Sequence, residues 1–195
     1  MTVTAQPLTM RARVIDAAVT LTTEDGWAQV TMARLAEVVG VSRQTVYNEV
    51  GSKPLLAEAM ILRELERFLA LVTVAFDAHP TDLVAAIRDA SRAVLEASHD
   101  NLLLKAIVSA THGADTELLP LLTTHAGALL STAKAVVVDR VAPYDVALSA
   151  EQLDAAIDMV VRVVLSHVMQ PSDSPGRTAD DIAWISARVL NPRSV

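Results

Sequence analysis

The chain has 195 residues, of which 52% are hydrophobic and 20% charged, and its mean hydropathy of +0.37 excludes an intrinsically disordered protein. It contains no cysteine, which excludes disulfides, thiolate metal sites and cysteine nucleophiles. Only 3% of the residues are aromatic and only 6 are glycine, whereas strands favour aromatic residues and tight turns favour glycine. The composition therefore predicts an all-α protein of one or two small domains.

The net charge of −7 argues against a nonspecific binder of nucleic acid, but the charge is unevenly distributed. Residues 1–53 contain as many basic as acidic residues, so the acidic excess lies entirely in residues 54–195. If any part of the chain approaches phosphate, the neutral segment is the candidate. No signal peptide is evident, and the longest uncharged stretch, residues 118–133, is too polar for a membrane span. We expect a cytoplasmic protein.

Hydrophobic residues recur at helical spacing along most of the chain. The first predicted helix, residues 10–24, has this spacing at Val14, Ile15, Ala18 and Leu21. Caps, glycines and prolines then divide the chain into further helices: Thr31 to Gly40, Ser42 to about Val50, 54–78, 81–98 (opened by Thr81 or Asp82), 101–111, 115–141, one that begins at a Ser149–Gln152 capping box, and 178–190. We expect about nine helices and no strand, in two domains that comprise residues 1–53 and 54–195.

The segment MARLAEVVGVSRQTVY, residues 32–47, has the spacing of a helix-turn-helix motif. Ala36 supplies the small side chain that is needed where two helices cross closely, and Gly40 can adopt the left-handed conformation that ends the first helix. Aliphatic side chains would fill the core between the two helices: Leu35, Val41 and Val46. Any αα-hairpin with a glycine turn could show part of this pattern.

Polar residues occupy the second helix of this motif. Ser42 would cap the helix and direct its N-terminus outward, as in a recognition helix that enters the major groove. The side chains that would face the groove are Arg43, Gln44, Thr45, Tyr47 and Asn48. This polar face favours DNA recognition over a purely structural hairpin.

Residues 10–56 resemble the DNA-binding domain of the TetR family of bacterial transcriptional regulators. The resemblance is carried by Gly26-Trp27 before Thr31, by Leu35-Ala36 and Gly40-Val41-Ser42, by Thr45-Val46-Tyr47, and by Ser52-Lys53. After Tyr47 the chain departs from the family pattern, which is His followed by Phe or Tyr. Glu49 would repel phosphate, so we expect it to point away from DNA or to pair with a nearby arginine. Val50 replaces the aromatic residue with a smaller core side chain.

The resemblance implies which residues contact DNA. Phosphate contacts are implied for four of them: Thr31, Thr45, Tyr47 and Lys53. Arg43, Gln44 and Asn48 are candidates for contact with base edges, because Arg matches guanine and Gln or Asn matches adenine through paired hydrogen bonds. A solvated or phosphate-bound side chain is the alternative interpretation of Arg43.

No catalytic, cofactor or metal site is expected. The five histidines, at positions 79, 99, 112, 125 and 167, have no further ligand at metal-site spacing. Ser131 and Lys134 match the serine–lysine tetrad of some acyl-enzymes, but they lie in mid-helix and the companion motifs are absent from the sequence. The sequence does not indicate an enzyme.

The acidic body contains many aliphatic side chains that could line a cavity or simply pack in a core. The candidates for ligand contact are Phe68, Leu104, Val108, Leu122 and Met159. Such a cavity would favour a lipophilic ligand, for example an acyl chain, a terpenoid or an apolar drug. In the resembling family, the region around His112 links the ligand cavity to the DNA-binding domain, although a purely structural histidine is the alternative.

The last two helices are apolar over a wide part of their circumference, which predicts burial on more than one side. The stripe consists of Leu153, Ile157, Val160, Val161, Val164, Leu165 and Val168, followed by Ile182, Ile185 and Val189. We therefore predict a homodimer through these helices that binds a palindromic, double-stranded operator as a repressor and releases it when a small hydrophobic ligand binds. The alternatives are an all-α small-molecule-binding protein without a DNA role, and a ligand-independent activator of the same family.

Overall fold

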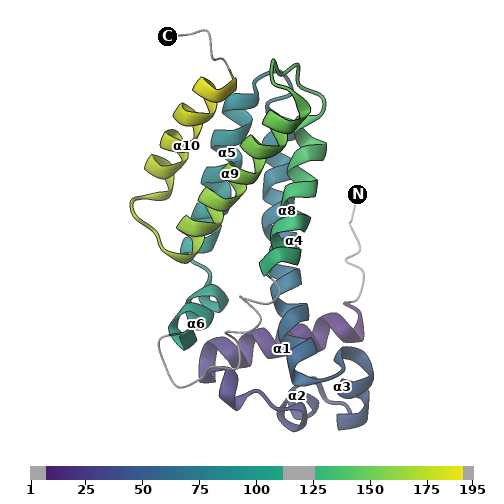
Figure 1. Ribbon diagram of the computed structural model, residues 1–195. Helices are drawn as coiled ribbons and strands as arrows, with labels where there is room; N and C mark the ends of the chain where they lie inside the picture. Colours follow the sequence, from purple (N-terminus) through teal and green to yellow (C-terminus); the bar gives the residue numbers. More distant parts are fainter. Residues whose placement is uncertain (1–7, 112–125, 191–195) are drawn as a thin grey trace, which may run out of the picture. The chain divides into compact units, whose positions relative to one another are not determined.

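The computed structural model describes residues 8–111 and 126–190, with side chains from 8 to 106 and from 127 to 190 (Figure 1). This part of the chain contains nine α-helices, one short 3-10 helix and no strand, so the predicted all-α class is confirmed. The helices are α1 (Met10–Asp25), η1 (Trp27–Gln29), α2 (Met32–Val39), α3 (Arg43–Val50), α4 (Lys53–Ala78), α5 (Leu83–His99), α6 (Leu102–Thr111), α8 (Ala126–Val141), α9 (Ala150–Met169) and α10 (Pro175–Leu190).

Side-chain caps begin the helices where the sequence predicts them. The Thr31 hydroxyl accepts the Arg34 N–H at 3.2 Å, and the Ser42 hydroxyl accepts the Thr45 N–H at 3.1 Å. Of the two candidates before α5, Asp82 is the cap, because its carboxylate accepts the Ala85 N–H at 2.9 Å. Ser149 and Gln152 form the predicted capping box, with bonds of 3.2 and 3.0 Å. These bonds satisfy backbone donors that the first turn of a helix cannot satisfy internally.

The structure bears on the starts of two predicted helices, the last one and the helix predicted over residues 115–141. The last helix begins at Pro175 instead of Thr178, because the Thr178 N–H already donates to the Ser174 carbonyl at 3.0 Å. Proline is compatible with a first turn, where its missing N–H would have had no helical partner. For the predicted helix 115–141 the structure describes α8 from Ala126 onward, and the earlier part lies outside the described residues.

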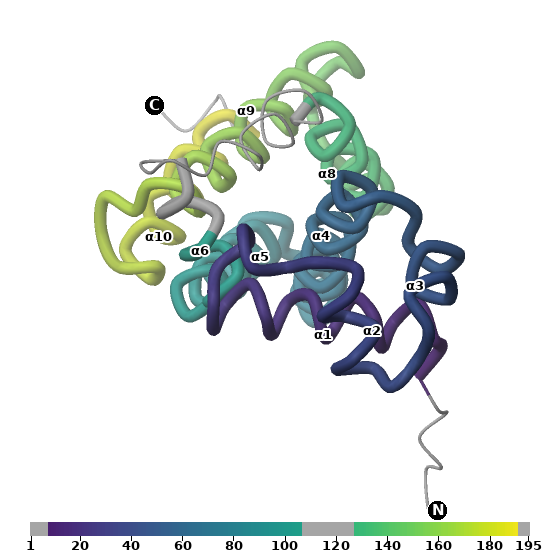
Figure 2. Tube along the Cα trace, turned by 90° about the horizontal axis from the view of Figure 1, so that it is seen from below, coloured from purple at the N-terminus to yellow at the C-terminus, as the bar shows by residue number. Residues whose placement is uncertain are grey.

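The chain divides into two compact units. Unit 1 comprises Met1–Arg63 and Leu102–Leu122 (Figure 2), and its core contains side chains of α1, η1, α2, α3 and the first half of α4, together with Leu103 of α6. The predicted apolar face of α1 is buried there, and Leu56, Ala57 and Met60 bring α4 into the same core. Unit 1 therefore extends past residue 53, the predicted end of the DNA-binding domain, because the start of α4 packs with the helices before it.

Unit 2 comprises Glu64–Asn101 and Thr123–Val195. Its helices α5, α9 and α10 lie side by side, and α10 packs most extensively against α5. The buried side chains of α10 are mostly small: Thr178, Ala179, Ile182, Ala183 and Ser186. In α9, Ile157 and Val161 belong to the core of unit 2, so this part of the predicted dimer stripe is already used within the chain.

Polar contacts join the helices of unit 2 around this core. The Tyr144 hydroxyl donates to the carbonyl oxygens of Phe76 at 3.3 Å and His79 at 2.8 Å. The Lys134 ammonium lies 2.7 Å from Asp154 and 3.7 Å from Asp158, which ties α8 to α9. Hydrogen bonding by the Arg162 guanidinium, assisted by Lys134, lowers the pKa of Asp158, which therefore remains charged at neutral pH.

Replacing Ala36 with leucine should destabilise unit 1 selectively. Ala36 is 5% exposed on α2, which packs against α3, so a larger side chain would force the two helices apart at an overpacking cost of about 1–3 kcal/mol. Chemical denaturation followed by circular dichroism should show the loss of stability, and DNA binding should fail while the overall helicity is retained. Ala70→Leu on the exposed surface of α4 is the matched control. Wild-type DNA binding by Ala36→Leu would contradict the assignment of residues 32–50 as one helix-turn-helix unit.

Candidate nucleic-acid interface

The turn between α2 and α3 has the geometry of a helix-turn-helix. Gly40 adopts the left-handed conformation (φ 75°, ψ 41°), which a side chain would disfavour. The N–H groups of Gly40 and Val41 both donate to the Ala36 carbonyl, at 3.0 and 2.9 Å, and thereby end α2. Leu35 and Val46 are fully buried between the two helices, as the spacing predicts. The α3 helix is therefore held in place by a small apolar core.

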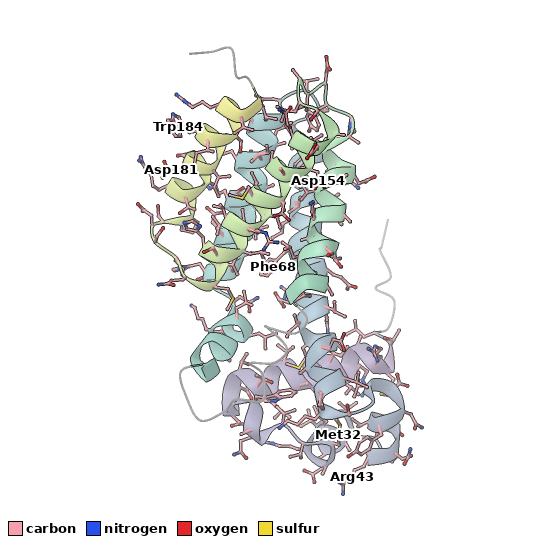
Figure 3. All side chains as sticks on the ribbon, viewed as in Figure 1. Met32, Arg43, Phe68, Asp154, Asp181 and Trp184 are labelled. Carbon is pink, nitrogen blue, oxygen red and sulfur yellow. The ribbon has the colours of Figure 1, made fainter. Side chains whose placement is uncertain are left out.

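The residues of α3 separate into a buried and an exposed face. Val46 and Val50 are buried, whereas the exposed positions are Ser42, Arg43, Gln44, Tyr47 and Asn48, with Thr45 half-buried beside them. Figure 3 shows Arg43 extending away from unit 1, in contrast to the buried Met32 of α2. All the predicted DNA-contacting residues except Thr31 and Lys53 lie on or beside this exposed face, and each of them has a polar side chain.

Hydrogen bonds order part of this face. The Gln44 side-chain amide donates to the Asn48 side-chain oxygen at 2.9 Å, so two of the base-edge candidates lie side by side one turn apart. The Ser42 and Thr45 hydroxyls are 2.9 Å apart at the start of α3. Arg43 forms no ion pair with any described residue, which leaves its guanidinium available to an external acceptor. The first turn contains no acidic residue, so the positive end of the helix dipole is not neutralised there.

The remaining two DNA-binding candidates lie at the starts of other helices. Thr31 is exposed and caps α2. Lys53 is the first residue of α4, and its ammonium lies 4.8 Å from the centroid of the buried Trp27 ring. This cation–π contact restrains the Lys53 side chain while its charge stays at the edge of unit 1.

The residues that depart from the family pattern are accommodated without disrupting the core. Val50 is 3% exposed and fills the inner side of α3 in place of an aromatic ring. Glu49 is half-buried, and its backbone carbonyl accepts a hydrogen bond from Arg11 of α1. The sequence analysis did not identify Arg11, because nothing in the spacing of α1 shows that its side chain reaches α3.

The candidate ligand-contacting residues are not all brought together. Phe68 and Leu104 are both half-buried, but they belong to different units. Met159 is 62% exposed on α9. The side chains of Val108, His112 and Leu122 lie outside the described residues.

Two histidines of unit 2 have structural partners. His79 lies 2.7 Å from an oxygen of Asp89, and the Nδ1 atom of His167 lies 2.8 Å from the Val163 carbonyl. Among the described residues, no cluster of three potential metal ligands occurs.

No helix in the described part of the chain is both long and apolar enough to span a membrane.

Comparison with known proteins agrees with this geometry. Residues 14–60 match the family model described as bacterial regulatory proteins, tetR family, and residues 82–188 match the model for the C-terminal domain of bacterial tetracyclin repressor. The HTH-type transcriptional regulator AlkX of Mycobacterium tuberculosis is 29% identical over 184 residues, which cover 94% of this chain and 84% of the relative.

Two solved structures share the fold. One is the TetR family repressor AlkX from a Dietzia strain, implicated in biodegradation of n-alkanes, with a TM-score of 0.76, 27% identity, and coverage of 96% of this chain and 98% of that one. The other is a TetR-family regulator from Mesorhizobium loti, with a TM-score of 0.63, 15% identity, and coverage of 95% and 98%. The C-terminal model alone spans more than half of the chain. The chain therefore belongs to the TetR family of bacterial transcriptional regulators and is a DNA-binding regulator of transcription.

Proposed function

We propose that this chain is a homodimeric repressor that binds a palindromic operator and releases it when a small hydrophobic ligand binds. The observation that carries the DNA-binding part is the exposed polar face of α3, which is backed by the buried Val46 and Val50. A recognition helix needs both features, since its inner side must be fixed while its outer side enters the major groove. Such a protein acts where bacterial DNA is, in the cytoplasm.

Two classes of DNA contact follow from the side chains and their places. Arg43, Gln44 and Asn48 on the exposed face of α3 would contact base edges and determine sequence preference. Phosphate contacts, which position the protein without sequence information, are assigned to Thr31, Thr45, Tyr47 and Lys53. The Ser42 cap would hold the N-terminal turn of α3 in the conformation that meets the groove.

The dimer interface that we propose lies on the outer face of α10 and the adjoining surface of α9. Trp184, Ile185 and Val189 are 57%, 54% and 43% exposed on α10, although the opposite face of the helix packs on α5 (Figure 3). The Arg188 guanidinium lies 4.0 Å from the Trp184 ring centroid and covers only part of it. A patch of this kind is typical of an interaction site. A second copy would cover it across a two-fold axis, and the two recognition helices could then reach half-sites about 34–36 Å apart.

The ligand that we propose contains a long aliphatic chain. The second unit is rich in aliphatic side chains and poor in aromatic ones, and a repressor of similar sequence, AlkX of Dietzia, is implicated in biodegradation of n-alkanes. The candidates for ligand contact remain those that the sequence suggests: Phe68, Leu104, Val108, His112, Leu122 and Met159. Release requires the ligand to bind one conformation of the dimer more tightly than the operator-bound conformation.

Substitutions at Lys53 and Gln44 should separate the two classes of DNA contact. Lys53→Ala should weaken binding to every duplex and reduce the slope of log affinity against log salt by about one per recognition domain, because one phosphate contact is lost. Gln44→Ala should reduce the preference for the operator by about 1–3 kcal/mol with little change in slope. Fluorescence anisotropy titrations over a salt series, with an operator selected from random DNA and a scrambled duplex, measure both quantities.

The control for the first variant is Lys53→Arg, which retains the charge and should retain the slope. Because Lys53 also contacts Trp27, thermal unfolding must show that unit 1 stays folded in each variant. Identical behaviour of Lys53→Ala and Gln44→Ala would refute the assignment of phosphate and base roles.

Ile185→Glu should convert the dimer to a monomer. Ile185 is 54% exposed, so the charge should leave unit 2 folded but oppose burial against a second copy. Analytical ultracentrifugation measures the change, and operator binding should weaken because one recognition domain loses the effective concentration supplied by the other. Val74→Glu on α4, where valine is 67% exposed, is the matched control and should remain dimeric. A dimer that persists in Ile185→Glu would place the interface elsewhere. Val161 is unsuitable for this test, because it is buried in the core of unit 2.

A saturated sixteen-carbon chain should stabilise the protein and release it from DNA. Hexadecane, hexadecanol and hexadecanoate can be compared, with butyrate as the short-chain control. A ligand present at a hundred times its dissociation constant adds about 2.7 kcal/mol of stability, which differential scanning fluorimetry detects as a higher melting temperature. The same compound should lower operator affinity in anisotropy titrations. If none of the three changes either measurement, the proposed ligand class is wrong.

A further inference from the structure

Two arginines of α1 contact the carboxyl ends of both helices of the helix-turn-helix. The Arg13 guanidinium donates to the backbone carbonyl of Val39, the last residue of α2, at 2.9 Å. The Arg11 guanidinium donates to the backbone carbonyl of Glu49, in the last turn of α3. Residues two apart on a helix point in different directions. Arg13 therefore contacts α2, while Arg11 contacts α3.

The chemistry of a helix end explains why a guanidinium is suited to these positions. The last four carbonyls of a helix have no partner within it, and they form the negative end of the helix dipole. In α3 the Tyr47 carbonyl accepts the Gly51 N–H at 2.9 Å, and the Glu49 carbonyl accepts from Arg11. A positively charged donor at such an end is stabilising through both the hydrogen bond and the dipole. Neither α2 nor α3 has a basic residue of its own in its last turn.

The α1 helix, which carries both arginines, is itself held in unit 1 by core packing and by contacts with α4. Val14 and Ala18 are fully buried in the core. On the polar side, the Arg63 guanidinium of α4 lies 2.6 Å from the Asp16 carboxylate and 3.4 Å from the Ala12 carbonyl. The position of α1 therefore restrains both ends that its arginines hold.

We propose that Arg11 and Arg13 are positioning residues for DNA recognition. They fix the orientation of α3 relative to α2 by holding the carboxyl ends of both helices, while the Gln44 and Asn48 side chains remain exposed. Both arginines act through backbone carbonyls and not through phosphate. The inference rests on the proposed role of α3 as the recognition helix.

The test compares Arg11→Met and Arg13→Met with the wild-type dimer. Methionine retains much of the aliphatic stem but removes the donor and the charge. Each variant should bind the selected operator about threefold to tenfold more weakly, in keeping with a charged group at a helix end. Binding to the scrambled duplex, and the salt slope on that duplex, should not change. Arg11→Lys and Arg13→Lys should recover part of the operator affinity, because lysine restores a charged donor. Arg92→Met, which removes an exposed charge from α5, is the control and should bind like the wild type.

Three outcomes would overturn the proposal. Unchanged operator affinity in both methionine variants would show that the carbonyl contacts do not orient α3. A salt slope lowered by about one per recognition domain would show that the arginines contact phosphate directly. Equal losses on operator and scrambled duplex, together with a lower melting temperature and no recovery in the lysine variants, would show a purely structural role.

The Gln44→Ala variant distinguishes this inference from the proposed function. If Gln44→Ala retains full operator preference, α3 does not recognise bases, and the proposed function fails first. If Gln44→Ala loses preference while Arg11→Met and Arg13→Met retain it, the recognition helix is correctly assigned and only the positioning role is wrong.

Discussion

The close crossing of α2 and α3 is the constraint on which the DNA-binding surface depends. A small side chain at Ala36 lets the two helices approach, the left-handed Gly40 turns the chain, and Val46 closes the core between them. Because Ala36 and Val46 are buried, the other side of α3 is left exposed, and its polar residues lie on that surface. The exposed polar face is therefore a consequence of packing on the inner side, and a volume change there would displace the whole face.

Helix ends determine how firmly that face is held. The N-terminus of α3 is capped by its own neighbour in sequence, Ser42, whereas the carboxyl ends of α2 and α3 are bonded by Arg13 and Arg11 from a different helix. The Ser42 cap sets where α3 begins, whereas the two arginines tie the carboxyl ends of α2 and α3 to α1. The α3 helix is thus contacted at both ends and on its buried side, while its outer face is exposed.

The α10 helix has two different faces. Its small buried residues permit close packing on α5, and its other face presents Trp184, Ile185 and Val189. Apolar side chains that are exposed together in a single chain are typical of an interaction site, and this face is the one that we propose a second copy covers. In α9, by contrast, the apolar residues Ile157 and Val161 are buried in the core of unit 2.

The sequence alone determined the all-α class, the capped helix starts and the helix-turn-helix, because caps, a glycine turn and helical spacing are local signals. It also indicated which residues of α3 are polar and exposed. Tertiary structure decided the rest: which apolar residues of α9 and α10 are buried in the chain, that Met159 lies on the surface, and that the α1 arginines reach the ends of α2 and α3. The arginine contacts join residues as much as 38 positions apart, and α10 packs on α5 from much farther along the chain. The helical period of a sequence shows which face of a helix is apolar but not which partner covers it.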